Sequence, residues 1–479
     1  MNIRHLLILL VVLTTGQGLR AQYQLGLRTQ RRAGVAALAH NPAAAVHSRY
    51  TWDLNLVGAG IFVNNNYGYL QNFGLLDLAT TDDLNFDEIS DHPELNTVGY
   101  DFFAGNRDRY FTLHGYVEGP SVHIRVNKNH SFGLLTGAKT LLGIFNLPGE
   151  FSYPDYNDRL LNEPFTVSPF HGAGASYYEF GLNYAYRNPT VYGAVSFGVT
   201  AKYLAGLDAI YFANRTDFNY RKIGNDGIEG TQVDLTYALT SNQVRNFSFE
   251  GYTPEINGSG MAFDLGITYE LDGDDPDLPR WRLGASILDI GWLSFSRNAE
   301  RHELQSDQRV RLFTENYDDV EGAADYQRAV RRLSEAVFDD PDESLAANRF
   351  SVRLPTRMLL SADVHIGENL FANATFIKSA SFGENALRRG SVMAFTPRYE
   401  HKWGALSVPV SLYQWNDPRV GLAARIGFLT IGTDHLGGLF GEQETTGADV
   451  YVSLRVHTLR QGFRPRYGWR GRRVKCFDF

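Results

Sequence analysis

The chain has 479 residues, of which 43% are hydrophobic and 13% aromatic, and its formal net charge is −8. The acidic balance gives no support to a nucleic-acid partner, and the single cysteine, Cys476, excludes an intramolecular disulfide or a cysteine-cluster metal site. A chain of this length would normally contain about three soluble domains. No linker-like stretch divides it, which favours one large closed sheet.

Residues 1–21 have the pattern of a secretory signal peptide. Arg4 and His5 give a polar, basic start, Leu6 to Leu13 is an unbroken apolar run, and Leu19-Arg20-Ala21 is a plausible cleavage site. The apolar run is too short to span a bilayer as a helix, and no later segment offers the roughly 18 apolar residues that such a span needs. An uncleaved anchor is the alternative interpretation.

Residues 22–48 lack strand character. The stretch from Arg28 to His40 predicts a short helix, and Asn41-Pro42-Ala43 follows it. If the strands that come next close into a barrel, we expect this segment at the periplasmic end or inside the lumen. A mobile N-terminal arm is the alternative.

The later sequence alternates between apolar and polar residues with a period of two. Blocks at 178–187, 191–203 and 261–271 each place Phe, Leu, Ile, Val, Met or Tyr on one face and polar residues on the other. Successive side chains of a β-strand point to opposite faces. Many such strands behind an export signal predict a transmembrane antiparallel β-barrel, with lipid outside and a polar lumen inside. An array of soluble β-sandwiches is the weaker alternative.

The first strand pattern starts at Trp52, and a long acidic loop at 64–107 follows it. Fourteen further candidate strands come next, which makes fifteen. Because closed outer-membrane barrels usually have an even number, we predict about fourteen strands within residues 49–458. The further candidates are 109–128, 130–142, 175–187, 190–205, 207–220, 230–239, 259–271, 280–297, 350–366, 369–379, 391–401, 404–415, 419–433 and 448–458.

Residues 299–348 interrupt the alternation with an acidic insertion. The insertion has thirteen Asp or Glu against six Arg, and apolar residues at helical spacing predict an amphipathic helix between Ala323 and Phe338. Long loops on rigid scaffolds concentrate function, so this insertion is expected to be a cap or an element that binds a partner such as an envelope protein. The tight turn at Gly367-Glu368-Asn369 looks periplasmic and favours an extracellular insertion, whereas counting strands back from the C-terminus gives the opposite side.

Residues 459–479 form a basic tail with seven Arg or Lys against one Asp. Such a tail would contact anionic lipid head groups, the cell wall or another envelope protein. A solvated, irregular end is an equal alternative.

The polar faces of the predicted strands supply the lumen-facing set. Mixed charge on these faces argues against a strongly ion-selective pore, and structural pairs across the interior are favoured over a specific binding site. The set comprises Asp53, Asn55, Glu179, Arg187, Lys202, Asp264, Asp363, His365, Arg425 and Arg455.

No pattern predicts catalysis. The thirteen histidines do not form a metal-binding spacing, no Gly-x-Ser-x-Gly elbow occurs, and we expect neither an enzyme nor a metal or other cofactor. A hydrolase whose Ser and His come from distant strands is the alternative.

Several motifs together resemble the long-chain fatty-acid transporter superfamily of outer-membrane barrels. Asn41-Pro42-Ala43 before a first strand at Trp52 is similar to the start of its mature members. Leu354-Pro355-Thr356 is similar to a recurrent element of the same superfamily. Three further motifs resemble an uncharacterised family related to it: Gly119-Pro120-Ser121, Leu283 to Gly291, and Gly421 to Asp434.

The resemblance implies a fourteen-stranded barrel in the bacterial outer membrane whose N-terminal hatch gates a route for apolar ligands. The first functional hypothesis is therefore passive transport of a hydrophobic or amphipathic small molecule. The second is a non-transporting barrel that serves as a docking or assembly partner in the envelope. The candidate ligand-binding residues on the hatch are Val35, Leu38, Asn41, Pro42 and Val46.

Overall fold

The computed structural model describes most of the chain between Tyr23 and Thr458. The described residues are 23–74, 77, 85–88, 97–103, 109–149, 160–224, 227–240, 254–273, 278–316, 323–440 and 442–458. The predicted signal peptide, the basic tail and much of the acidic loop lie outside them. Within the described residues, no helix is both long and apolar enough to cross a membrane.

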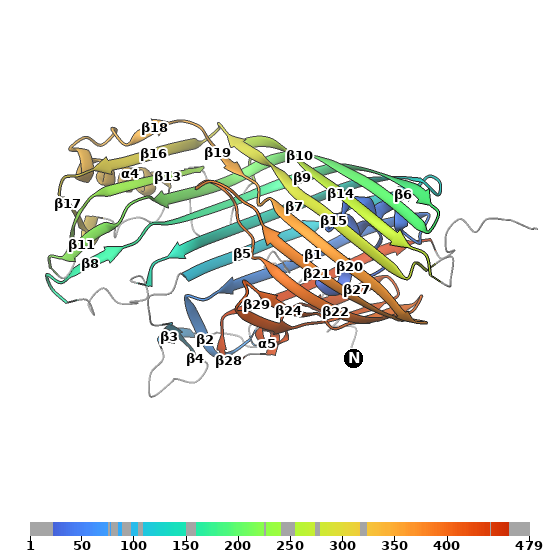
Figure 1. Ribbon diagram of the computed structural model, residues 1–479. Coiled ribbons are helices and arrows are strands. Elements are labelled where there is room, and N and C mark those ends of the chain that lie inside the picture. Colours follow the sequence, from blue (N-terminus) through green and yellow to red (C-terminus); the bar gives the residue numbers. More distant parts are fainter. Residues whose placement is uncertain are drawn as a thin grey trace, which may run out of the picture.

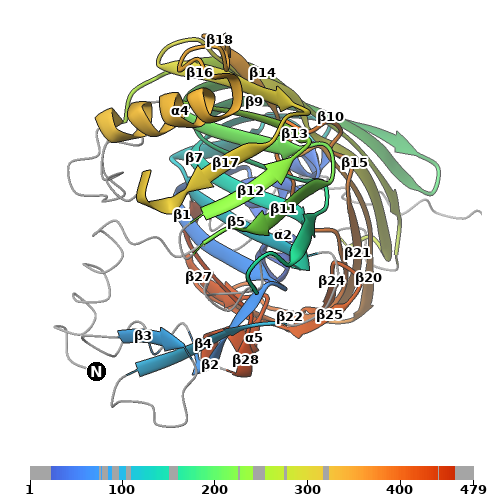
Figure 2. The same cartoon turned by 90° about the vertical axis from the view of Figure 1, so that its left-hand side faces the viewer.

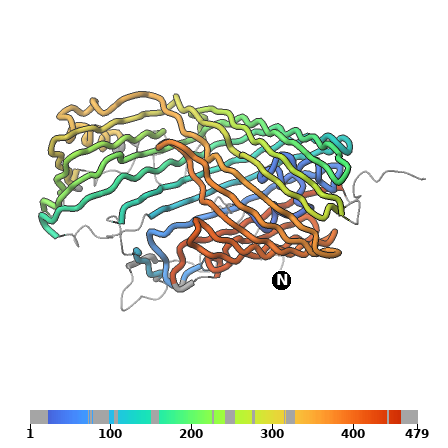
Figure 3. The backbone as a smooth tube through the Cα atoms, viewed as in Figure 1, coloured from blue at the N-terminus to red at the C-terminus, as the bar shows by residue number. Residues whose placement is uncertain are grey.

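The described strands form one closed antiparallel barrel (Figures 1 and 3). Each span pairs with the next along the chain, and β29 pairs with β1 from Asp53↔His457 to Asn64↔Gly447, which closes the sheet. The spans are β1 Trp52–Asn65; β5 Arg109–Glu118 with β6 Ser121–Arg125; β7 His130–Leu147; β9 Phe170–Thr190; β10 Gly193–Asn214; β13 Val233–Thr240 with β14 Gly258–Leu271; β15 Trp281–Phe295 with β16 Ala299–Ser306; β18 Leu345–Ala347 with β19 Phe350–Arg353 and β20 Arg357–Gly367; β21 Leu370–Ser379; β22 Val392–Glu400; β23 Gly404–Ser407 with β24 Val410–Tyr413; β25 Asp417–Val420 with β26 Leu422–Ile426; β27 Leu429–Thr433; and β29 Gly447–His457.

The predicted total of fourteen spans is confirmed, but individual strands differ from the prediction. The candidate at 207–220 is largely a continuation of β10, because a register shift between Gly206 and Asp208 reverses which residues face inward. The candidates at 230–239 and 259–271 are two parts of one span, since both pair with β10. The candidate at 419–433 is a hairpin of two spans that turns at Gly427-Phe428. Val191 and Tyr192 lie in the turn between β9 and β10 and not on opposite faces of a strand.

The outer surface carries an apolar band bounded by aromatic residues. On β15, Trp281 and Trp292 are both exposed, and apolar residues including Leu283, Ile287 and Ile290 point outward between them. The distance along the strand matches the roughly 9–11 residues that cross a bilayer. A closed barrel with such a band satisfies its backbone polar groups in lipid. The protein is therefore an outer-membrane β-barrel.

The short turns lie at one end of the barrel, together with the start of β1 and the end of β29. At the opposite end, β9, β10, β13 and β16 reach farther from the short turns than the strands on the other side of the barrel do (Figure 1). The insertion lies at this extended end, on the opposite side from the Gly367-Glu368-Asn369 turn (Figure 1).

The insertion contains more strand than the sequence predicted. Its first residues form β16, which pairs with β13. Arg301 and Glu303 of β16 are not buried, and their polar side chains hid this strand from a search for apolar alternation. The amphipathic helix α4 does span Ala323–Phe338. A small sheet of β8 Pro164–Val167, β11 Phe218–Lys222, β12 Gly227–Thr231 and β17 Val310–Phe313 lies across this end beside α4 (Figure 2).

A second small sheet projects from the side of the same end. It consists of β2 Gly68–Phe73, β3 Asn85–Glu88, β4 Thr97–Phe102 and β28 Glu442–Thr445. The other short helices are α2 Leu25–Arg28, η1 Gly34–Ala39, η2 Pro42–His47, η6 Thr314–Asn316 and α5 Leu436–Phe440.

Candidate functional site

The N-terminal segment 23–48 lies inside the barrel at the short-turn end, and we refer to it as the hatch (Figure 3). It consists of α2, η1 and η2, and most of its residues are buried, polar ones included. Asn41, in extended conformation, begins η2 by accepting a hydrogen bond from the Ala43 amide at 2.9 Å, and proline at the first helical position suits such a start. Asn41-Pro42-Ala43 thus forms a helix start that faces the wall.

The η2 end of the hatch packs against β9, β10 and β14. Asn41 Nδ2 donates to the carbonyl of Ile267 at 3.0 Å, and Asn183 Nδ2 donates to the carbonyl of Pro42 at 3.3 Å. Gly198 on β10 faces Pro42 and Ala43 so closely that an added Cβ would lie 2.3 Å from their backbone atoms. The wall therefore accommodates this turn of the hatch only because residue 198 has no side chain.

A buried ionic cluster fixes the α2 end of the hatch. Arg31 Nε lies 2.9 Å from an Asp363 carboxylate oxygen, and its backbone amide donates to Glu400 at 3.0 Å. Arg398, which has no exposed side-chain surface, bridges the same two carboxylates. Asp363 thereby joins the hatch to β20 and β22.

Asp53 and Arg455 anchor the middle of the hatch. The Asp53 carboxylate accepts a hydrogen bond from the Val35 amide at 2.8 Å and lies 3.6 Å from Arg455 Nη1. Arg455 Nη1 also donates to the carbonyl of Arg32 at 3.1 Å. Arg425 contacts the hatch through Gln30, with Nε 3.4 Å from the Gln30 side-chain oxygen. All these wall residues are buried.

The remaining predicted lumen residues occupy four different places. Asn55 is buried beside β29, where its side-chain oxygen accepts a hydrogen bond from the Ser453 hydroxyl at 3.2 Å. Glu179, Lys202 and Asp264 form one charged layer above the hatch, in which Lys202 Nζ lies 2.7 Å from Asp264 and from Asp289. Arg187 is half-buried near the short turns, 3.6 Å from Glu270. His365 also lies near a short turn, where it stacks on Phe371 and is only partly buried.

The apolar hatch residues mostly pack against the wall. Leu38 and Val46 form a cluster with Val35, Ala45 and Ala185. Only Val35 of the predicted ligand-binding residues lines the cavity beside the hatch. A ligand-binding role for Val35, Leu38, Asn41, Pro42 and Val46 stays a prediction.

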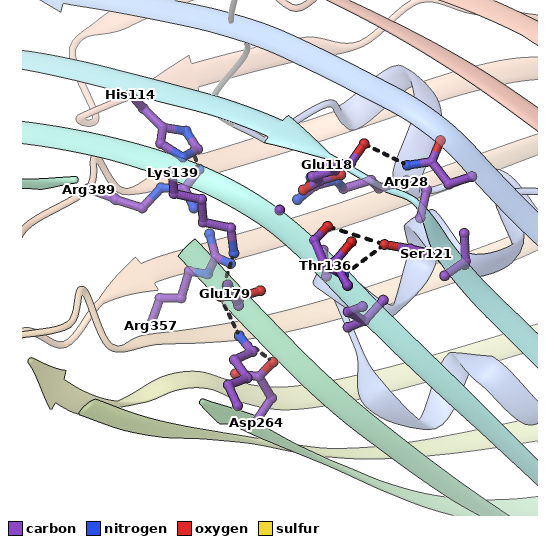
Figure 4. A pocket seen from close by; sticks show the side chains of 17 residues that line it. Arg28, His114, Glu118, Ser121, Thr136, Lys139, Glu179, Asp264, Arg357 and Arg389 are labelled. Atoms are coloured by element: carbon purple, nitrogen blue, oxygen red, sulfur yellow. Dashed lines mark hydrogen bonds and ion pairs between the residues drawn. The ribbon is translucent and has the colours of Figure 1, made fainter. Parts of the chain in front are cut away.

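A cavity of about 50 Å³ separates the hatch from the wall and the charged layer (Figure 4). Most of its lining residues are polar or charged, and they include Arg28 of the hatch, Lys139, Lys202 and Arg357 of the wall, and Arg389. A cavity of about 10–15 Å³ is large enough for one water molecule. This cavity therefore has room for a few waters or for one small molecule.

The segment 380–391, between β21 and β22, folds into the barrel and meets the hatch. Its Gly390 carbonyl accepts a hydrogen bond from the Tyr23 hydroxyl at 2.5 Å, and the Arg389 guanidinium lies 4.7 Å from the centre of the Tyr23 ring. Leu387 is completely buried in an apolar cluster with Leu204, Tyr177 and Phe350 on the barrel interior. Along the lumen, the hatch is therefore followed by the charged layer and then by this apolar cluster.

Sequence reasoning missed several of these residues. Arg398 and Glu400 occupy inward-facing positions of a correctly predicted strand, so the alternation itself could have identified them. Asp289 sits at a positive φ of 57° next to a register shift between β14 and β15, which breaks the alternation. Arg389 lies in a loop whose inward course no local pattern reveals.

The described residues contain no group of three or more His, Cys, Asp or Glu placed to hold a metal ion. Comparison with protein-family models matches residues 42–434 to a family of unknown function, DUF5723. The chain belongs to this family. No curated protein matches the sequence.

Among solved structures, the toluene transporter TodX of P. putida is similar at 12% identity, with 89% of this chain and 94% of that chain covered and a TM-score of 0.38. A TodX mutant monoaromatic hydrocarbon channel has 10% identity, coverage of 88% and 94%, and a TM-score of 0.41. The CymD monoaromatic hydrocarbon channel has 9% identity, coverage of 89% and 94%, and a TM-score of 0.33.

Replacement of Asn41 by alanine tests how much the η2 start contributes to hatch docking. We expect the loss of the cap and of the Ile267 hydrogen bond to weaken docking by about 1–2 kcal/mol. Hydrogen exchange of peptides from 23–48 in the detergent-purified protein measures this change. Asn188→Ala, at an exposed position of β9, is the matched control and should leave that exchange unchanged. Equal protection in both variants would contradict the assigned role of Asn41.

The hatch contains two buried histidines, His40 and His47, and we expect acid to weaken the docking of the hatch against the wall. Burial, with Arg28, Arg357 and Arg389 nearby, lowers the pKa of His40 well below its ordinary 6.5. Burial also lowers the pKa of His47, and although Glu270 opposes the shift, Arg282 and Arg187 add to it. A docked hatch therefore binds fewer protons than a released one, and docking weakens as pH falls below 6.5.

Each histidine contributes at most a tenfold change in the docking equilibrium per pH unit below 6.5. Hydrogen exchange of the hatch at pH 7.5 and 5.5, corrected for intrinsic exchange rates, measures the effect. His40→Gln with His47→Gln should remove most of the pH dependence. A hatch that is equally protected at both pH values in the unsubstituted protein would show that these histidines do not govern it.

Proposed function

We propose that the protein is a passive outer-membrane transporter of a small hydrophobic or amphipathic molecule, gated by the hatch. The observation that carries the proposal is that one terminal segment closes the lumen through side-chain contacts to wall residues of several strands. Such contacts form and break without disturbing the backbone pairing of the barrel. Displacement of the hatch would enlarge the adjoining cavity while the barrel stays closed.

The wall beside the cavity supports a lateral route. Between β5 and β6 the strand is interrupted at Gly119-Pro120, and β1, which pairs with both, shifts register against β29 between Asn55 and Val57. Asn55, Glu118 and Ser121 line the cavity at this interruption. A molecule released from the cavity would reach the membrane here and avoid the closed lumen.

Uptake of radiolabelled octanoate by cells with the protein in their outer membrane tests the proposal. Expression of the intact protein is expected to raise uptake above that of cells lacking it. Deletion of residues 23–48 should abolish the gate and alter that rate, provided the variant runs as a folded barrel on an unheated gel. If toluene and octanoate both enter at the rate of cells without the protein, the transport proposal fails.

A docking function is the second candidate, and the extended end of the barrel favours it. There β8, β11, β12 and β17 form a sheet beyond the apolar band, in which Glu229 bonds to Arg221 and Arg311. A rigid surface outside the membrane suits an envelope-protein partner. Replacement of 314–344 by a short linker should abolish co-purification of such a partner and leave octanoate uptake unchanged.

A further inference from the structure

The cavity beside the hatch is rich in buried cations. Arg28, Lys139, Lys202, Arg357 and Arg389 contribute five basic groups to its lining, against three carboxylates from Glu118, Glu179 and Asp264. Figure 4 places several of them around one space, with Lys139 and Arg357 close to Glu179. The carboxylates are already engaged: Glu118 with Arg28 at 2.7 Å, Glu179 with Lys139 at 2.8 Å, and Asp264 with Lys202 at 2.7 Å.

Arg357 faces the Tyr23 ring, with its guanidinium 5.7 Å from the ring centre, and two of its hydrogen-bond donors have no acceptor among the described residues. Its Nη2 lies 3.2 Å from Asp289, which is shared with Lys202. Its Nε and Nη1 atoms are buried and have no hydrogen-bond partner among the described residues. The side chain is 5% exposed, so bulk water does not satisfy these donors. Buried guanidinium donors without partners are costly and rare.

His114 adds a second unsatisfied group on the same side. Its Nδ1 is 3.1 Å from Arg389 Nη2, while its Nε2 is buried and has no partner among the described residues. With Nδ1 accepting from Arg389, Nε2 carries the proton and is a donor. Burial and the neighbouring charge of Arg357 lower the pKa of Arg389 to about 10, as expected where positive charges outnumber their acceptors.

We propose that this cavity is a binding site for a small carboxylate anion, held by Arg357 and His114. A carboxylate has two acceptor oxygens, so one oxygen can accept from a free guanidinium donor of Arg357 and the other from the His114 Nε2–H. A cavity of about 50 Å³ accepts an anion the size of formate or acetate. The occupant would connect three parts of the protein: the wall through Arg357 and Lys139, the hatch through Arg28, and the segment 380–391 through Arg389. It would therefore stabilise the closed hatch.

Titration of the detergent-purified protein with acetate in a chloride–HEPES buffer tests the site, with calorimetry and thermal unfolding as readouts. Acetate is expected to bind and to raise the unfolding temperature, because a ligand that binds only the folded state stabilises it. Arg357→Gln should weaken binding at least about tenfold, since a charge-assisted hydrogen bond is lost. Arg215→Gln, at a half-exposed position outside the cavity, is the matched control and should bind acetate normally.

If Arg357→Gln does not fold, His114→Phe provides the same test at the second unsatisfied donor of the cavity. If octanoate displaces acetate, the carboxylate head of a longer acid is the natural occupant of the site. If acetate binds and octanoate does not displace it, the occupant is a free small acid. The absence of acetate binding, or equal binding by the unsubstituted protein and both cavity variants, overturns the proposal. Because binding is measured without transport, this outcome is independent of the octanoate uptake result.

Discussion

Gly198→Val is expected to expel the hatch from the barrel. A Cβ at residue 198 would lie 2.3 Å from backbone atoms of Pro42 and Ala43, and neither backbone moves as cheaply as a side-chain tip. Because β10 is paired on both sides along its whole membrane-facing length, the hatch gives way and not the wall. Peptides from 23–48 should lose most of their hydrogen-exchange protection while peptides from β10 keep theirs.

Gly367→Ala is the matched control for this substitution. Gly367 lies at a short turn, and an added Cβ would meet nothing within 4 Å. Its hatch should exchange like that of the unsubstituted protein. If Gly198→Val leaves hatch protection intact, the close packing of Pro42 against β10 is not what seats the hatch.

Asp363→Ala is expected to give the second largest effect. The Asp363 carboxylate accepts from Arg31 of the hatch and from Arg398 of the wall, and its removal leaves two buried guanidinium groups short of an acceptor. Breaking a buried pair from one side costs about 3–5 kcal/mol. Most of that cost is avoided when Arg31 leaves with the hatch. The substitution should therefore raise the population of released hatch more than it raises the population of unfolded barrel.

Hydrogen exchange of 23–48, together with heat-induced unfolding on gels, separates the two effects of Asp363→Ala. Asp234→Ala is the control, because Asp234 pairs with Arg215 at a partly exposed site distant from the hatch. A barrel that melts as a whole, with no selective loss of hatch protection, would argue that Asp363 stabilises the wall alone.

The barrel was predictable because its strongest determinant is local. Alternation at 178–187 and 261–271 fixes which residues face lipid, and Phe180, Leu182, Met261 and Ile267 are indeed exposed while Asn183 and Asp264 are buried. The strand number was harder to predict. The register shift at Gly206/Asp208 reverses the alternation within β10, so a period-two pattern divides that strand into the candidates 190–205 and 207–220.

The site was less predictable than the barrel, because it is assembled from distant parts of the chain. Arg31 meets Asp363 and Glu400 across more than 300 residues, and nothing local in the sequence selects those partners. Asp53 and Arg455 were identified as lumen-facing, but their role in holding Val35 depends on where the hatch lies. The inward course of 380–391 depends on the burial of Leu387 among residues of the opposite wall.

The most direct test of the central claim, that the hatch gates passage, is octanoate uptake by a protein whose hatch is locked. The Leu38 side chain points at Gly133 on β7, with its Cδ1 3.1 Å from an added Cβ. Leu38→Cys with Gly133→Cys, in a Cys476→Ser background, places a thiol on the hatch facing a thiol on the wall, and a gel run without reductant shows that oxidation has joined them. Oxidation is expected to reduce uptake to that of cells lacking the protein, and reduction to restore it, whereas the single-cysteine variants stay unaffected. Equal uptake by the oxidised and reduced forms would contradict the account.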